Sequence, residues 1–205
     1  MSENQNLSIR QSPLQAIIGE TTFSSLEVQN EWATCLGLAD TSLLEKWGLR
    51  GSGAADWLAT MGVAAPAEVY ATRPLSEGGL IARIGKEEFF LEAATCSQSF
   101  GSLRDALSTG SGCTAVVRED ASFLVTGSRS LDLFAQTCSH RFAASPVDKW
   151  VYTRVAGVNC GILPQSQGGQ TRYRLWFDPS YAVYLGETLL GIATELGGGA
   201  VRNSL

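Results

Sequence analysis

The most reactive side chains in this chain belong to its cysteines and its one histidine. The cysteines are Cys35, Cys96, Cys113, Cys138 and Cys160, and the histidine is His140. No two cysteines lie within four residues of each other, so the chain has no C-x-x-C redox or zinc pair. A zinc site built from Cys138 and His140 would need two more ligands from distant segments. The sequence therefore predicts buried free thiols and no metal site.

Catalytic and nucleotide-binding motifs are equally weak. A Ser-His-Asp set would have to include His140, and nothing around this residue resembles a nucleophile elbow. Gly51-Ser-Gly53 begins like a dinucleotide-binding turn, but the third small position is occupied by the charged Asp56. A tight turn at a helix start explains this segment better. The sequence predicts no catalytic residue and identifies no cofactor-binding residue.

The amino-acid composition of the chain bears on which kinds of partner it can bind. The chain has 205 residues, with 15 Lys or Arg against 20 Asp or Glu, a balance that disfavours nucleic-acid binding. Charged residues make up only 17%, against a usual value of about 25%. Either another protein covers part of the surface, or Ser, Thr and Gln take the place of charged residues on the solvated surface. No apolar run reaches the length of a membrane span, and no signal pattern opens the chain, so we expect a cytoplasmic protein without membrane contacts.

Hydrophobic periodicity and turn residues predict alternating helices and strands. Residues 1–12 are polar and are expected to be a flexible N-terminal segment. Strands are expected near 23–28, 31–38, 79–84, 87–92, 113–118, 123–126, 150–156, 158–163 and 172–177, and helices near 13–18, 54–61, 99–107 and 128–138. A final helix is capped by Asp178 and ended by Gly197, with a buried stripe of Tyr181, Tyr184, Leu185, Thr188, Leu189, Ile192 and Leu196.

Two parts of the chain repeat the same order of elements. Leu49-Arg-Gly-Ser52 matches Val125-Thr-Gly-Ser128, and each turn lies between a strand and a helix. This pattern predicts an α+β fold of pseudo-duplicated strand–helix–strand units with antiparallel or mixed sheets. We expect a single domain over 13–205, made of two related halves at about 13–110 and 111–200.

Several segments together resemble the glycine-cleavage T-protein superfamily of folate-binding proteins. They are Gly37–Ser42, Trp47–Leu58, Gly62–Pro66, Gly78–Leu91, Val125–Ser128, Thr153–Gly157 and Tyr173–Leu185. The resemblance covers most of residues 12–200. Its nearest branch is the small gamma subunit of heterotetrameric sarcosine oxidase and related N-methyl amino acid dehydrogenases. The resemblance implies a T-protein-like domain.

For catalysis, the resemblance implies loss of the working residues. T-proteins carry a folate-activating aspartate in a segment that corresponds here to Glu77–Ile81, which contains no aspartate. They also carry a further C-terminal barrel domain. The segment around Cys160 does not match the signature of the related iron–sulfur-repair branch.

The resemblance therefore implies a non-catalytic, gamma-type subunit that is not an enzyme by itself. It would belong to a flavin-dependent complex that oxidises an N-methyl amino acid such as sarcosine, with one-carbon transfer to tetrahydrofolate. The partners would be larger flavoprotein subunits, and these would carry FAD, FMN, NAD, zinc and tetrahydrofolate.

Two other interpretations of the sequence remain open. The chain could be a stand-alone folate-binding or aminomethyltransferase-like protein, in which Asp40, Glu77, Arg83 or Arg154 contacts the ligand. It could also be an unrelated scaffold with the same fold.

The strand expected over 172–177 contains the candidate interface. Tyr173, Leu175 and Phe177 point to one face, which is expected to be core. Arg172, Arg174 and Trp176 point to the other face, and such a combination of Trp and Arg is typical of protein interfaces. We expect these three residues to contact the partner subunits. The alternative is that a helix of the same domain covers them.

Overall fold

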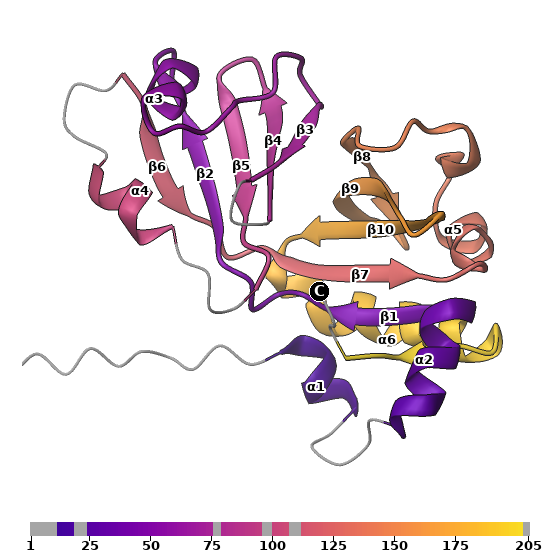
Figure 1. Ribbon diagram of the computed structural model, residues 1–205. Coiled ribbons are helices and arrows are strands. Elements are labelled where there is room, and N and C mark those ends of the chain that lie inside the picture. The colour runs from indigo at the N-terminus through magenta and orange to yellow at the C-terminus, as the bar shows by residue number, and fades with distance from the viewer. Residues whose placement is uncertain (1–11, 19–23, 76–78, 96–99, 107–111, 203–205) are drawn as a thin grey trace, which may run out of the picture.

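The chain folds into two β-sheets with helices around them (Figure 1). The computed structural model describes residues 12–18, 24–75, 79–95, 100–106 and 112–202. The segment expected to be flexible lies, except for Ser12, outside these residues. The mixed helix and strand content and the two sheets confirm the predicted α+β class. None of the described helices is both long and apolar enough to cross a membrane.

The six-stranded sheet, here called sheet A, has the strand order β11-β1-β7-β10-β9-β8. Its strands are β1 (Gly37–Asp40), β7 (Ala121–Thr126), β8 (Val151–Val155), β9 (Val158–Gln167), β10 (Gln170–Phe177) and β11 (Gly199–Ala200). All neighbours are antiparallel except β1 and β11, which are parallel.

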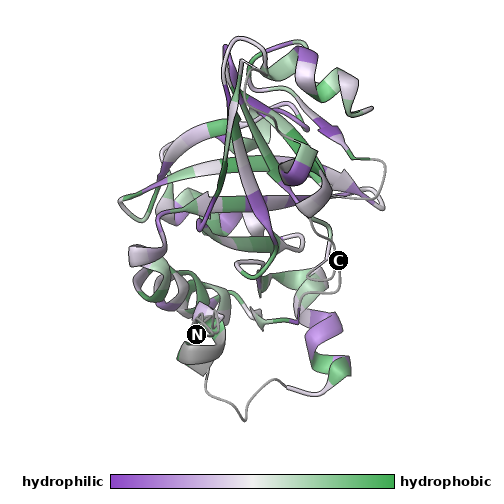
Figure 2. Cartoon of the chain, turned by 90° about the vertical axis from the view of Figure 1, so that its left-hand side faces the viewer, coloured by the Kyte–Doolittle hydropathy of each residue, from purple (hydrophilic) through white to green (hydrophobic). Residues whose placement is uncertain are grey.

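The five-stranded sheet, here called sheet B, has the order β3-β4-β5-β2-β6 and is antiparallel throughout. Its strands are β2 (Lys46–Arg50), β3 (Thr72–Pro74), β4 (Leu80–Gly85), β5 (Glu88–Glu92) and β6 (Thr114–Val117). The turn between β4 and β5 is the hairpin predicted at Gly85-Lys86. Figure 2 shows hydrophobic segments running through the strands of both sheets.

The strand orders of the two sheets confirm the pseudo-duplication. Beyond β11, sheet A runs β1-β7-β10-β9-β8, and sheet B runs β6-β2-β5-β4-β3. In each sheet the second strand is followed by a Gly-Ser turn, a helix and then the remaining three strands in chain order. The two units exchange their first strands. Strand β1 comes just before β2 in the chain but pairs with β7 of sheet A, and β6 comes just before β7 but pairs with β2 of sheet B. The two units are therefore interlocked.

The repeated Gly-Ser turn has a physical reason that is the same in both units. Gly51 and Gly127 have φ angles of +143° and +98°, which residues with a side chain rarely adopt. A Cβ on Gly51 would lie 2.3 Å from the carbonyl oxygen of Gly112, and one on Gly127 would lie 2.4 Å from that of Cys35. Both carbonyls belong to the residues just before the exchanged strands. Glycine at these positions lets each turn pack directly on the incoming strand.

The helices are α1 (Pro13–Ile18), α2 (Leu26–Cys35), α3 (Ala54–Thr60), α4 (Gly101–Ala106), α5 (Ser130–Thr137) and α6 (Ala182–Glu195), with two 3-10 turns at Phe142–Ala144 and Pro179–Tyr181. Helix α6 lies beneath sheet A in Figure 1. It buries Leu185 and Leu189 in the larger hydrophobic core, together with residues of β7, β9 and β10. A second core lies between sheet B and helices α3 and α4. The predicted stripe of α6 was wrong at Tyr181 and Tyr184, which are exposed.

The strands predicted near 23–28 and 31–38 were wrong in large part, because residues 26–35 form α2. Ser25 caps this helix by accepting a hydrogen bond from the Val28 amide. Its buried face includes the polar Gln29, whose side chain donates to the Ser24 carbonyl and accepts from the Arg202 amide. A polar residue on the buried face conceals helical periodicity, and Leu26, an apolar residue within the range predicted to be a strand, is 71% exposed.

Candidate functional site

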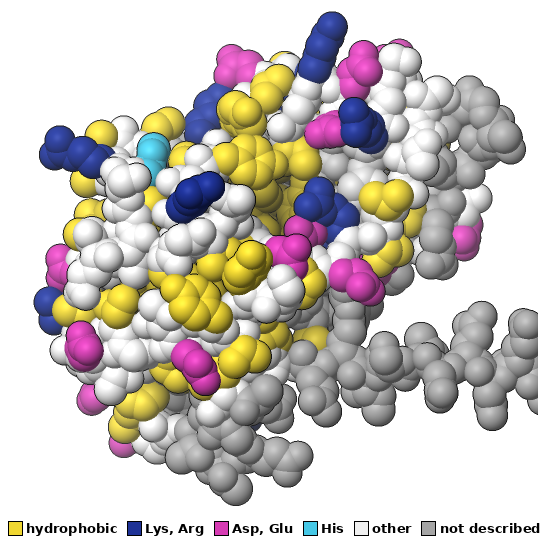
Figure 3. All heavy atoms as spheres, turned by 180° about the vertical axis from the view of Figure 1, so that it is seen from behind, with side chains coloured by type: hydrophobic (Ala, Val, Ile, Leu, Met, Phe, Trp, Pro, Cys, Tyr) yellow, Lys and Arg dark blue, Asp and Glu magenta, His cyan; other side chains and the backbone are white. Residues whose placement is uncertain are grey.

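A cleft of about 610 Å³ lies where sheet A and sheet B meet. Its walls include the aromatic residues Phe90, Trp150, Tyr152 and Trp176, from β5, the segment before β8, β8 itself and β10. Figure 3 shows hydrophobic side chains gathered between the two lobes of the molecule, flanked by basic and acidic groups. The cleft is the candidate site because it combines apolar walls with a few charged groups.

The aromatic wall is tightly packed. The rings of Trp150 and Trp176 stack with centroids 4.5 Å apart and planes 13° apart, and Phe90 lies 5.3 Å and 5.4 Å from them. Gly161 on β9 makes room, because a Cβ there would lie 2.4 Å from the Trp150 ring. The Trp150 indole nitrogen is buried without a hydrogen-bond acceptor of good geometry. The wall therefore has little freedom to move.

Charged groups line the mouth of the cleft. The Arg118 guanidinium donates two hydrogen bonds to Asp120, of 2.7 Å and 2.8 Å, and lies over the Phe90 ring at 5.5 Å. The hydrogen bonds that Arg118 donates to Asp120 raise the Arg118 pKa. Burial raises the pKa of the neighbouring Tyr152 hydroxyl, against the opposing charge of Arg118. Arg154 donates a 3.0 Å hydrogen bond to Asn159 and is exposed.

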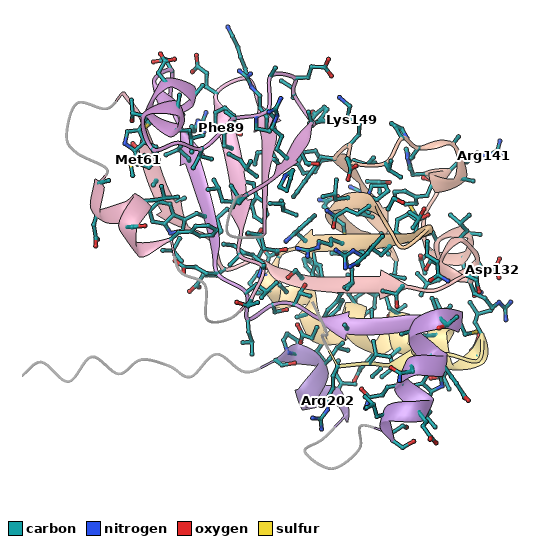
Figure 4. The ribbon with its side chains drawn as sticks, in the orientation of Figure 1. Met61, Phe89, Asp132, Arg141, Lys149 and Arg202 are labelled. Atoms are coloured by element: carbon teal, nitrogen blue, oxygen red, sulfur yellow. The ribbon has the colours of Figure 1, made fainter. Side chains whose placement is uncertain are left out.

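A second contact between the sheets closes one end of the cleft. The Trp150 amide donates to the Tyr70 carbonyl at 2.7 Å, and the Tyr70 and Tyr152 rings meet edge to face. Lys149 lies between β3 and β8 (Figure 4), where its ammonium pairs with Glu68 at 2.6 Å. These contacts fix β8 relative to sheet B.

Beneath the aromatic wall lies a buried charge cluster centred on Glu92. One carboxylate oxygen of Glu92 accepts from Arg174 at 2.5 Å, and the other accepts from the Trp176 indole nitrogen. The Lys46 ammonium lies 3.8 Å from Glu92 and donates to the carbonyls of Thr41, Ser42 and Leu44. Lys46 and Glu92 are 0% exposed. Arg174 and Trp176 lie on β10 of sheet A, whereas Glu92 lies on β5 of sheet B beside Lys46 of β2. The two hydrogen bonds to Glu92 therefore fasten the sheets together.

The structure buries two of the three candidate interface residues inside the chain. Trp176 is 3% exposed and Arg174 is 5% exposed, so neither presents a surface to a partner in this chain. Sheet B, and not a helix, covers this face of β10. Arg172 is half-buried, and its pKa is lowered by burial and then by the charge of Arg174. The expectation of an exposed patch failed because a single strand pattern cannot show that a second sheet of the same chain lies on its polar face.

Of the possible ligand-contacting residues that the structure describes, Asp40, Arg83 and Arg154, only Arg154 lines the cleft. The Asp40 carboxylate already accepts hydrogen bonds within the chain. The donors are the Ser12 hydroxyl, the Leu14 amide at the start of α1 and the Ser42 amide. Arg83 donates to the carbonyls of Ala67 and Lys86. Glu77 lies outside the described residues.

The described cysteines and His140 form no metal-binding group, although the Cys138 sulfur accepts a hydrogen bond from the His140 backbone amide. Among the described residues, no group of three His, Cys, Asp or Glu side chains is arranged to hold a metal ion. Cys138 contacts the Thr153 hydroxyl, and His140 shares a hydrogen bond with Ser145. Cys160 lines the cleft, and burial raises its pKa to about 12. Because its thiol is protonated at neutral pH, it is a poor nucleophile. Cys96 lies outside the described residues.

Sequence reasoning missed Lys46, Glu92, Arg118 and Trp150. Glu92 carried a usable signal, because it ends a strand that is otherwise apolar, Phe89-Phe-Leu91. Lys46 precedes Trp47 in the same way. Their pairing depends on the contact between the two sheets, which no local pattern reveals. The aromatic walls and the paired rim charges can hold a planar or apolar group.

Two solved structures share this architecture. The glycine cleavage system aminomethyltransferase T from Bartonella henselae superposes with a TM-score of 0.69 and 17% identity, over 86% of this chain and 50% of that one. A chain of the heterotetrameric sarcosine oxidase from Corynebacterium sp. U-96, solved in complex with pyrrole 2-carboxylate, superposes with a TM-score of 0.71 and 17% identity, over 94% of this chain and 98% of that one. This chain has the T-protein-like fold.

The T-protein-like fold was predicted from the sequence resemblance, and the superpositions confirm it. The chain spans about half the length of the aminomethyltransferase, but nearly the whole of the matched sarcosine oxidase chain. No protein-family model matches the sequence, and neither does any curated protein.

Proposed function

We propose that this chain is a non-catalytic, gamma-type subunit of a cytoplasmic, heterotetrameric sarcosine oxidase-like complex. The observation that carries the proposal is the two-way match with one chain of such a complex, 94% of one chain against 98% of the other. Two chains of the same fold and nearly equal length suit the same place in an assembly. The T-protein supports this less well, because half of its length has no counterpart here.

In this proposal the chemistry belongs to larger flavoprotein subunits. These partners would hold FAD, FMN, NAD, zinc and tetrahydrofolate, and the complex would oxidise an N-methyl amino acid such as sarcosine. The described cleft supports a structural role for this chain, because burial raises the pKa of its thiol, Cys160, to about 12 and so keeps the thiol protonated at neutral pH. The Glu92 cluster is fully engaged in joining the two sheets.

Co-purification tests the proposal. The tagged chain is expressed in its native cells, isolated with its bound proteins, and assayed for flavin absorbance and sarcosine-dependent electron transfer. We expect larger flavin-containing subunits and turnover in the isolated assembly, with no turnover by the chain alone. Turnover of sarcosine by the chain alone, with added flavin and tetrahydrofolate, would contradict the proposal.

A stand-alone folate-binding or aminomethyltransferase-like protein is the second candidate. The aromatic cleft favours it, because the stacked Trp150 and Trp176 rings border a space large enough for a planar ring system. Titration of the purified chain with tetrahydrofolate, followed by tryptophan fluorescence, separates the two candidates. Quenching that saturates at micromolar ligand and disappears in Arg154→Ala would favour this second function.

A further inference from the structure

The sheet edges differ in how well they are protected against pairing with another strand. Edge strand β3 carries the exposed Arg73 and Pro74, and β8 carries the exposed Arg154. Charged residues and proline at an edge discourage added strands. Edge strand β11 has only two residues. By contrast β6, with the sequence Thr-Ala-Val-Val, has neither charge nor proline.

The outer edge of β6 also exposes apolar side chains. Val116 is 56% exposed and Val117 is 55% exposed, and consecutive strand residues point to opposite faces. The Arg118 amide donates to the Lys46 carbonyl, so Val116 and Thr114 also point their backbone groups toward β2. The amides of Ala115 and Val117 therefore point outward. In the described part of the chain, no strand pairs with this edge.

Sheet A shows what fits such an edge. There the strand equivalent to β6 is β1, and its outer edge pairs with β11 in parallel. The carbonyls of Leu36 and Leu38 accept from the amides of Gly199 and Val201, at 3.0 Å and 2.9 Å.

The register of the repeat carries this pattern over to sheet B. Leu38 pairs with Val125, and Ala115 pairs with Leu49. Since Val125 and Leu49 each lie two residues before the repeated glycine, Ala115 is the counterpart of Leu38. The outward carbonyl of Ala115 therefore corresponds to the Leu38 carbonyl, which in sheet A accepts the hydrogen bond from the Val201 amide.

We infer that β6 is a docking edge for an extended segment of a partner subunit, which adds to sheet B as a parallel strand. The inference rests on the proposed function, because it assumes a multi-subunit complex. Ala115, the counterpart of Leu38, would hold the segment by backbone hydrogen bonds, and a segment one residue pair longer than β11 would also bond to Val117. Its apolar side chains would contact Val116 and Val117. The docked strand would complete in sheet B the arrangement that β11 provides in sheet A.

The parallel direction favours a different chain over a second copy of this one. A twofold axis between two copies would set β6 against β6 in the antiparallel direction. The arrangement in sheet A is parallel, so a segment of another chain matches it better.

Hydrogen–deuterium exchange on the wild-type chain, alone and in the purified complex, tests the inference. We expect the Ala115 and Val117 amides to exchange rapidly in the isolated chain and at least about tenfold more slowly in the complex, as paired edge amides do. A matched pair of variants adds a second test. Val117→Pro removes an outward amide without breaking the β2 pairing, whereas Val117→Ala keeps the amide and shortens the side chain.

We expect Val117→Pro to reduce recovery of the complex at least about tenfold, and Val117→Ala to reduce it less, because the backbone carries most of the docking. Circular dichroism should show both variants folded. If Val117→Pro is unfolded, the exchange data on the wild type still decide.

Three results would overturn the inference. A complex that forms while both amides still exchange rapidly would remove the docking edge but leave the proposed function standing. Amides already protected in the isolated chain would mean that a segment of this chain or a second copy covers the edge, and sedimentation would tell these apart. Failure to recover any complex from wild-type cells would count against the proposed function and the inference together.

Discussion

Sheet A and sheet B follow one strand order but differ in how they are closed. Sheet A has the 14-residue α6 on one face, part of sheet B on the other, and β11 along its edge. Sheet B has the shorter α3 and α4 on one face, and its other face is only partly covered by sheet A, leaving the cleft. Duplication therefore fixes the order of the strands, while the added helix and strand decide which surfaces stay open.

The largest expected effect concerns the charge cluster that joins the sheets. Glu92→Gln keeps the side-chain shape but removes the carboxylate that Arg174 binds and that lies 3.8 Å from the Lys46 ammonium, in a buried site. We expect the free energy of unfolding to fall by about 3–5 kcal/mol, as when one partner of a buried ion pair is removed. Urea denaturation followed by circular dichroism measures the loss.

Glu88 on the same strand is the matched control. Its partner Arg50 has a side chain that is 80% exposed, so Glu88→Gln should cost less than about 1 kcal/mol. If the two substitutions lower the free energy of unfolding equally, the buried cluster at Glu92 contributes no more than the exposed pair at Glu88. The cluster would then not be what joins the two sheets.

Trp176 tests the same junction through packing. Trp176→Ala should destabilise the isolated chain by about 3–5 kcal/mol, because it opens a cavity beside Phe90 and Trp150. Trp176→Phe keeps a ring but loses the donor to Glu92, and should cost about 1.5–3 kcal/mol. Thermal unfolding of both variants measures the difference. An isolated Trp176→Ala chain as stable as the wild type would mean that sheet B does not cover this residue.

The paired glycines test the duplication itself. Gly51→Ala and Gly127→Ala should each cost about 2–4 kcal/mol, because both have positive φ and both would clash with backbone. Gly157 also has positive φ, but a Cβ there meets nothing within 4 Å, so Gly157→Ala should cost only about 1–2 kcal/mol. Chemical denaturation of the three variants ranks them. A large cost at only one of the paired turns would show that they are not equivalent.

The smallest effect concerns Cys160 in the cleft wall. Burial raises its pKa from 9.0 to about 12, so the folded state holds its thiol proton more tightly than the unfolded state. Its contribution to stability is therefore full below the ordinary thiol pKa and is lost as the pH rises from 9.0 to about 12. At pH 8 we expect Cys160 to react with a disulfide reagent only after denaturation, as mapped by mass spectrometry. Rapid labelling of the folded chain would contradict its burial.

Much of the fold could be predicted from the sequence because its signals are local. The Gly-Ser turns, the hairpin at Gly85-Lys86 and the Asp178 cap each act within a few residues. Helix α2 was missed because Gln29 is buried by hydrogen bonds to Ser24 and Arg202, and the latter is 173 positions away in the chain.

The candidate site was less predictable, because its residues meet only when the sheets pack. Glu92 and Arg174 are separated by 82 positions, and neither pattern alone indicates the other. The strand alternation correctly placed Trp176 and Arg174 on the face opposite Tyr173, but could not show that sheet B lies there.

Native mass spectrometry of the assembly purified from native cells shows whether this chain is a subunit. We expect this 21.8 kDa chain to be bound in a fixed one-to-one ratio with larger, flavin-containing subunits. We also expect the complex to lose this chain first when Val117→Pro is introduced. A wild-type chain found only as a free monomer, or only as a homo-oligomer, would contradict the account.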